Sequence, residues 1–498
     1  MVRGELSLYA DEMRGHWPPV PFYFYGAPQA WLRPSLMLGR LESVALGAVV
    51  LILVFGLAQR WAGPVAGATA AALFCSHGFV LGYFATVHFA GLVAVLHLLG
   101  LYVLFATTWE RRHLVAMAIF ALLFLVKNNF WPTIPFMLLV LALARGRPLA
   151  ERVALVAIAI ALPLAFFAWD PRHLKMLAYV PGLQPWVEPL GYRPWYALTE
   201  DAGELAMRSE YADIPWEFSL SGRLRGIAGG VLFLARRYAA WLVLLALVAA
   251  IAAWRTRDWR SARRLWSPPG VALTFWLFWF LVACQFVVLG PYAKQAVGFV
   301  GAIAPLLAVA VGCLVAATFT RFVAPGPARV VVAGAVVIIV LISPWVHRQH
   351  NLPRRIAASD SPLVTLPKIA TQLAALLPAG DTRIFYLADP MPLHLAGRRS
   401  YLQQFNQERW GFTTLRAPER YRRVGMWGPA EVEAWLGGDA RYAVLESDAV
   451  TFYRNRPRYR PILDRIDALL AERFTRIGEI RGRGDDTFVV FRAKERVP

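Results

Sequence analysis

The sequence predicts a polytopic α-helical membrane protein that carries a C-terminal water-soluble α/β domain. The 498 residues are 58% hydrophobic and only 17% charged, and the apolar residues form long uninterrupted blocks rather than amphipathic stripes. Blocks of this kind can cross a bilayer as helices. After residue 346 the composition changes to that of a soluble domain, so the fold class has two parts.

About ten apolar runs are candidate membrane spans. They cover 41–58, 64–83, 86–107, 113–127, 129–144, 153–169, 238–254, 270–289, 295–318 and 328–346. We therefore expect a transmembrane bundle over 41–346 that follows a first-loop segment at 1–40. A long loop at 170–237 interrupts the bundle and is rich in Trp, Tyr and Pro.

The arginines between these runs predict the orientation of the bundle. One side receives Arg60, Arg111, Arg112, Arg145, Arg147, Arg152, Arg255, Arg257, Arg260, Arg263, Arg264, Arg321 and Arg329. Arginine-rich short loops face the cytoplasm, so the segments 1–40, 170–237 and 347–498 are expected outside it. An external segment 1–40 with no apolar run before it needs translocation of the tail or an upstream helix, and we expect the coding sequence to begin further upstream.

The C-terminal segment 347–498 reads as an extracytoplasmic α/β domain. Strand-like runs are predicted at 383–388, 441–446 and 487–492, and helix-like runs at 363–377, 429–436 and 460–473. The segment contains no G-x-G-x-x-G run, nucleophile elbow or Cys/His cluster, so its sequence does not indicate a second catalytic centre. A stabilising cap, a gate of the cavity and a receiver of the acceptor remain alternatives for its role.

The net charge of +20 lies largely in the loops and the C-terminal segment. Membrane orientation and lipid headgroups explain it without a nucleic-acid partner, for which there is no motif. Cys75, Cys284 and Cys313 fall inside apolar runs at no metal-ligand spacing, so we expect small buried side chains and no metal site.

Two lysines depart from the charge pattern. Lys127 and Lys294 fall on the side opposite the arginine loops, in very short turns that normally avoid positive charge. Their pairing on one face indicates an anionic ligand, and near a lipid surface phosphate is the expected anion. The alternative is that both lysines only reach the headgroups of ordinary lipids.

The first-loop segment holds the other candidate residues. Acidic residues come first, at Glu5, Asp11 and Glu12, and an aromatic cluster containing Tyr23 and Tyr25 follows. Aromatic and proline-rich sequence is typical of anchoring at the headgroup level, whereas carboxylates are unusual there. An exposed acidic pair on a solvated turn is the alternative to a functional one.

These residues carry a resemblance to a known family. The acidic residues, the run Glu12–Pro19 and the helix start Arg40–Ser43 resemble, in this order, the first external loop of the GT-C glycosyltransferases. The runs Phe124–Phe130 and Pro291–Lys294 are similar to two short turns of the same enzymes. The bacterial protein-mannosyltransferase-like and lipid A aminoarabinose-transferase-like members are the most similar, and the resemblance extends over nearly the whole chain.

The resemblance implies a reaction and roles for the residues. Such enzymes pass a sugar from a polyprenyl phosphate to an acceptor hydroxyl on the external face, with an acidic first-loop residue as general base. Asp11 matches by residue type and by its neighbour Glu12, and Glu5 matches more closely by spacing. The family places this carboxylate just after a transmembrane helix, which does not precede it in this sequence.

The remaining roles follow from the same chemistry. Lys127, Lys294 and Arg40 would stabilise the phosphate as negative charge grows on it. Contacts with substrate or lipid are expected from His16, Trp17, Tyr23, Tyr25 and Tyr292. The expected partners are a polyprenyl-phosphate-linked sugar, a glycan, lipid or protein acceptor, and membrane lipid. No cofactor is implied with certainty, and the sequence does not indicate a divalent cation.

The expected function is thus a membrane glycosyltransferase of an inner membrane. One alternative is a transporter or flippase of lipid-linked saccharide. Transporters usually show paired halves with interrupted helices and polar residues near the midplane, whereas the charges here lie at one face. A catalytically inactive GT-C-like scaffold is the other alternative, since the spacing of the acidic residues departs from the family pattern.

Overall fold

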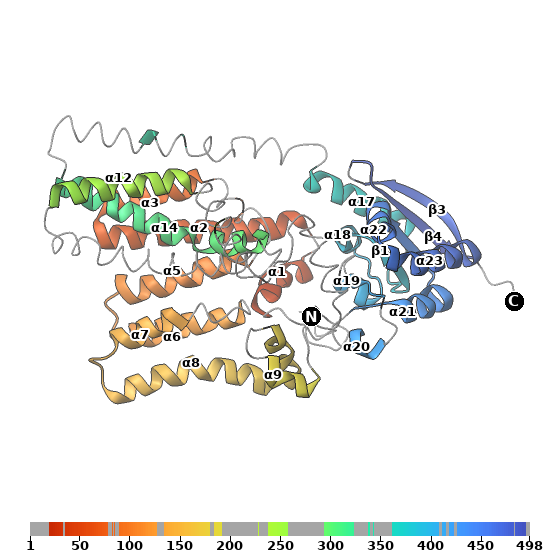
Figure 1. Cartoon of the computed structure of the whole chain (residues 1–498), viewed down its shortest axis with the longest axis horizontal. Helices are drawn as coiled ribbons and strands as arrows, with labels where there is room; N and C mark the ends of the chain where they lie inside the picture. Colours follow the sequence, from red (N-terminus) through yellow and green to blue (C-terminus); the bar gives the residue numbers. More distant parts are fainter. Residues whose placement is uncertain are drawn as a thin grey trace.

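The computed structural model describes most of the bundle and most of the α/β domain. The described residues are 19–32, 35–77, 82, 84, 89–126, 134–179, 184–191, 228, 238–256, 293–322, 337–338, 342, 361–407, 411–414, 418–422, 426–482 and 484–494. Figure 1 shows an elongated bundle of helices with the α/β domain at one of its ends. Helix α1 lies at this same end, which we call the α1 end of the bundle.

The described bundle helices coincide with eight of the predicted spans and add α1. They are α1 (Pro19–Trp31), α2 (Leu36–Ala62), α3 (Pro64–Ser76), α5 (Ala90–Ala106), α6 (Arg112–Leu122), α7 (Ile134–Leu143), α8 (Leu149–Trp169), α12 (Ala239–Thr256) and α14 (Ala293–Phe322). A 3-10 turn, η1 (Leu123–Leu125), extends α6. Three short elements follow α8: η3 (Pro171–Tyr179), α9 (Gln184–Val187) and η4 (Glu188–Leu190). The predicted runs 270–289 and 328–346 lie outside the described residues, except for positions 337, 338 and 342.

Two of the described helices, α2 and α8, are long and apolar enough to cross a membrane. Helices α3, α5, α6 with η1, and the segment 304–319 of α14 are shorter apolar helices, so the expected count of about ten spans is not confirmed. Helix α8 is informative because only 6% of its most apolar window is buried. A helix that is both strongly apolar and exposed along its length is stable only against lipid or a protein partner.

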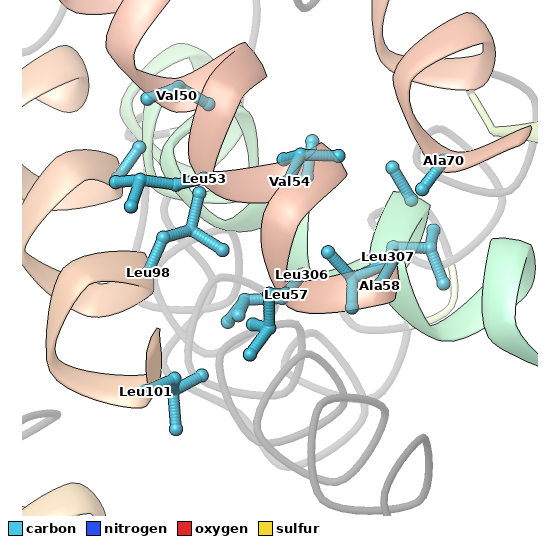
Figure 2. Packing of buried hydrophobic residues seen from close by; sticks show 14 of the residues in the cluster. Val50, Leu53, Val54, Leu57, Ala58, Ala70, Leu98, Leu101, Leu306 and Leu307 are labelled. Carbon is cyan, nitrogen blue, oxygen red and sulfur yellow. The ribbon is translucent and has the colours of Figure 1, made fainter. Parts of the chain in front are cut away.

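The bundle core forms where α2 packs against α3, α5 and α14. Figure 2 shows Leu53 of α2 facing Leu98 of α5, and both belong to one cluster of buried apolar side chains. Small residues bring the backbones close: a Cβ on Gly312 of α14 would lie 2.8 Å from the Ala70 Cβ of α3. Close approach through Gly and Ala is typical of helix packing in membranes.

The α/β domain contains a four-stranded sheet in the order β1-β2-β4-β3. The strands are β1 (Ile384–Leu387), β2 (Tyr442–Glu446), β3 (Phe474–Arg481) and β4 (Thr487–Ala493). Strands β1 and β2 are parallel, and β4 is antiparallel to both of its neighbours. The three predicted strands coincide with β1, β2 and β4, whereas β3 was not predicted.

Helices cover both faces of this sheet. They are α17 (Pro362–Leu376), α18 (Pro390–Leu395), α19 (Leu402–Gln407), α20 (Pro418–Arg422), α21 (Pro429–Ala434), α22 (Ser447–Arg454) and α23 (Arg460–Arg473). Residues alternate along β1: Phe385 joins a core with α21 and α23, and Tyr386 joins a core with α17 and α18. The predicted helical runs coincide with α17, α21 and α23.

Candidate functional site

The corner between α1 and α2 is fixed by reciprocal hydrogen bonds. The Gln29 amide nitrogen donates to the Ser35 carbonyl at 3.0 Å, and the Ser35 backbone N–H donates to Gln29 Oε1 at 2.6 Å. Ser35 is also the N-cap of α2, because its hydroxyl accepts from the Leu38 N–H at 3.3 Å. Capping satisfies one of the free amides at a helix start and fixes where the helix begins.

Helix α1 places the two candidate tyrosines differently. Tyr23 is 48% exposed, whereas Tyr25 is buried against α2. The Ser43 hydroxyl, itself buried, lies 3.2 Å from the Tyr25 hydroxyl and donates to it. Tyr25 therefore anchors α1 to α2, and Tyr23 is the one of the pair whose ring is open to a ligand.

Arg40 and Lys294 lie at the same level of the bundle. Figure 1 shows α2 and α14 running in the same direction, away from the α1 end. The two helices are level at Ala58 and Cys313, where the Cys313 thiol lies 3.8 Å from the Ala58 carbonyl. Arg40 precedes Ala58 by about 27 Å of helix and Lys294 precedes Cys313 by about 28 Å, at 1.5 Å per residue. The structure thus brings both positions to the α1 end, with the Lys294 backbone described but not its side chain.

The other candidate residues lie outside the part of the chain that the structure describes. They are Glu5, Asp11, Glu12, His16, Trp17, Lys127 and Tyr292. Their predicted roles remain predictions. Val126, directly before Lys127, is described, and helix α14 begins directly after Tyr292.

Two ionisable residues whose charged groups are shielded from solvent were not among the predicted site residues. Glu42, two residues after Arg40 on α2, has both carboxylate oxygens shielded from solvent, and no hydrogen-bond partner for them appears among the described residues. Lys175 on η3, beyond the end of α8, is 2% exposed. The criterion that selected Lys127 concerns very short turns, so it did not single out Lys175, which lies in the long loop 170–237.

The end of α8 next to η3 is held by polar contacts. The His173 Nδ1 lies 2.5 Å from the Phe166 carbonyl, and its ring stacks on Phe166 with centroids 4.1 Å apart. Arg172 donates to both carboxylate oxygens of Asp170 and holds the pKa of that carboxyl below its usual range. These contacts stabilise the turn from which Lys175 extends.

An apolar groove between α2 and α3 is a separate feature. It has a volume of about 440 Å³ and is lined by Leu51, Ile52, Phe55, Ala71, Ala72 and Cys75. No polar oxygen or nitrogen lines it, so it offers nothing for catalysis. Cys75 is exposed here, contrary to the expectation of a buried thiol, because its side of α3 faces away from the core; Cys313 is buried as expected. Among the described residues, no group of three His, Cys, Asp or Glu could hold a metal ion.

Comparison with known proteins shows a similarity of fold. No protein-family model matches the sequence, and no curated protein matches it. ArnT from Cupriavidus metallidurans, in a crystal structure with undecaprenyl phosphate bound, aligns over 97% of this chain and 91% of its own, with a TM-score of 0.51 and 14% identity. The apo structure of the same protein aligns over 95% and 87%, with a TM-score of 0.39 and 13% identity. At this identity the similarity is one of fold, so the fold of this chain resembles that of ArnT.

Proposed function

We propose that this protein is a membrane glycosyltransferase that moves a sugar from a polyprenyl-phosphate donor to an acceptor hydroxyl on the extracytoplasmic face. The observation that carries the proposal is the common level of Arg40 and Lys294 at one end of a GT-C-like bundle. The ArnT structure that shares the fold holds undecaprenyl phosphate, a ligand that such cations suit. The exposed apolar surface of α8 supports a location in the membrane.

The proposed reaction assigns a role to each group. A first-loop carboxylate, Asp11 before Glu5 and Glu12, accepts the proton of the acceptor hydroxyl as its oxygen bonds to the anomeric carbon. The bond from the anomeric carbon to the phosphate oxygen breaks, and the leaving polyprenyl phosphate gains negative charge. Arg40, Lys127 and Lys294 stabilise that charge. His16, Trp17, Tyr23 and Tyr292 contact the sugar or the lipid, whereas Tyr25, predicted with them, anchors α1 to α2.

A transfer assay with purified full-length protein tests the proposal. Asp11→Asn keeps the side-chain shape but removes the proton acceptor, so turnover should fall by roughly 10²- to 10⁴-fold while donor binding changes by no more than a few-fold. Glu5→Gln, measured in parallel, separates the two candidate bases. Full activity of both variants would place the base elsewhere, and a wild-type protein that transfers no sugar from any polyprenyl-phosphate donor would favour the transporter or the inactive scaffold.

A further inference from the structure

The carboxylate of Glu42 on α2 has no hydrogen-bond partner in the described part of the chain that would account for its shielded position. Both of its oxygens are enclosed, and neither has a hydrogen-bond partner among the residues that the structure describes. A carboxylate whose oxygens are shielded from water without partners is unfavourable for the folded protein. A group that raises the energy of the ligand-free protein in this way is a candidate for a binding role.

The nearby Arg40 side chain does not pair with the Glu42 carboxylate. Arg40 is two residues away on the same helix, and side chains at i and i+2 point to different sides. Glu42 instead shares the core-facing side of α2 with Gly39 and Leu46, which are both buried. The carboxylate therefore faces the interior of the bundle rather than lipid.

Packing between α2 and α5 sets the level of Glu42. Leu46 of α2 packs against Gly91 of α5, where an added Cβ would lie 3.0 Å from the Leu46 Cδ1, and Leu53 faces Leu98 seven residues further along both helices. The helices thus run in the same direction. Glu42 is one turn before Leu46 on α2, toward the α1 end. It lies about 3 Å further along α2 than Arg40.

The chemistry of an enclosed carboxylate restricts its ligand. Ionised, it only accepts hydrogen bonds, so a phosphate would be repelled. A sugar offers several neutral hydroxyl donors on adjacent carbons. Hydrogen bonds between hydroxyls and a carboxylate are charge-assisted and stronger than neutral ones.

We infer that Glu42 binds the hydroxyl groups of the donor sugar and makes the protein prefer the sugar-bearing lipid over the bare polyprenyl phosphate. The inference rests on the proposed function and extends it, because it assigns sugar recognition to a residue outside the phosphate-binding and proton-accepting groups. The proposed cations Arg40, Lys127 and Lys294 bind the phosphate, which both lipids have. Glu42 binds the sugar, which only the donor lipid carries.

Equilibrium binding to the full-length protein in detergent tests this assignment with three probes: undecaprenyl phosphate, undecaprenyl phosphate bearing mannose, and undecaprenyl phosphate bearing arabinose. Wild-type protein should bind at least one sugar-bearing probe more tightly than the bare lipid. Glu42→Leu should weaken that binding by roughly 10- to 100-fold, as expected for loss of hydrogen bonds to a charged group. Glu42→Gln should lose less, since its amide oxygen still accepts. Both variants should bind bare undecaprenyl phosphate within a few-fold of wild type.

Controls separate recognition from structure. Glu110→Gln removes an exposed carboxylate near the arginine loops and should change no affinity. Thermal unfolding without ligand should be unchanged or shifted upward in Glu42→Gln, because no partner is lost. Equal weakening of all three probes, or no weakening, would overturn the inference while leaving the proposed function intact. Wild-type protein that binds none of the probes would instead remove the proposed function, and the inference with it.

Discussion

Removing a lysine that binds the reacting ligand should lower turnover, whereas removing a lysine that only reaches lipid headgroups should not. If Lys127 and Lys294 stabilise the leaving phosphate, replacing either by Ala should lower turnover by roughly tenfold to a thousandfold, as for one preorganised electrostatic partner. Replacement by Arg should cost less, since the charge remains. Lys368→Ala, which removes an exposed lysine on α17 of the α/β domain, is the matched control. Normal turnover in both Ala variants would assign the two lysines to headgroup contact.

The buried tyrosine of α1 allows a second test at this scale. Tyr25→Phe keeps the ring but removes the hydroxyl that accepts from Ser43, so the free energy of unfolding should fall by about 0.5–1.5 kcal/mol. Tyr23→Phe, at an exposed ring, should not change it. Thermal unfolding in detergent measures both. A larger loss at Tyr23 would contradict the placement of the two rings on α1.

Single residues also show how far sequence reasoning reaches. Arg40 and Lys294 could be predicted to share one side, because the rise of a helix is constant and their positions depend only on where each apolar run begins. The enclosure of Glu42 could not be predicted, since it depends on which helices pack around α2. Asp11 and Glu5 were selected by resemblance, and they remain predictions because they lie outside the described residues.

Secondary-structure elements were predictable where their hydrophobic pattern is regular. Strands β1, β2 and β4 are dominated by apolar and aromatic residues, and they were predicted within one or two residues of their ends. Strand β3 was missed because its sequence is rich in charge, follows α23 without a turn residue, and has a register irregularity between Arg476 and Gly478. Helix α1 was missed because Pro21 and Pro28 obscure its helical pattern, although Pro19 suits a first helical position.

Helix α21 offers a matched comparison of a buried and an exposed carboxylate. Glu431 is 1% exposed and accepts from the Tyr421 hydroxyl, Arg422 Nε and the Gly428 N–H, at 2.5, 2.5 and 2.9 Å. Burial, together with the bond to Glu431, raises the pKa of the Tyr421 hydroxyl, so it stays protonated and donates. Glu433, two residues later, pairs with Arg465 at the surface.

Removing these two carboxylates should therefore have different effects. Glu431→Ala leaves buried donors unpaired and should destabilise the α/β domain by about 3–5 kcal/mol. Glu433→Ala should leave stability unchanged within error, because the pair with Arg465 is solvated. Hydrogen exchange of the amides at 426–436, measured on the full-length protein, should accelerate only in the first variant. Similar exchange in both would mean that the Glu431 network does not hold α20 and α21 together.

At the scale of the whole molecule, the arrangement of the two parts matches the charge pattern of the sequence. The turn between α7 and α8, which carries Arg145 and Arg147, lies at the end of the bundle opposite the α/β domain in Figure 1. The positive-inside bias assigns that turn to the cytoplasm. If one helical bundle separates the two, the α/β domain must face the other compartment, where the lipid-linked sugar would be used.

Two glycines make this orientation measurable. Gly146, in the α7–α8 turn, and Gly438, in the π-helical turn Trp435–Asp439, are both exposed, and a Cβ added at either would meet no atom within 4 Å. In a background without Cys75, Cys284 and Cys313, Gly438→Cys should react with a membrane-impermeant maleimide from outside the inner membrane. Gly146→Cys should react only after the membrane is made permeable.

A reporter that is active only outside the cytoplasm should likewise work when it is fused after Pro498 and fail when it is fused after Arg257. The reverse pattern of labelling would place the α/β domain in the cytoplasm and invert the bundle, so that Arg40, Lys294 and Glu42 would face cytoplasmic rather than extracytoplasmic donors.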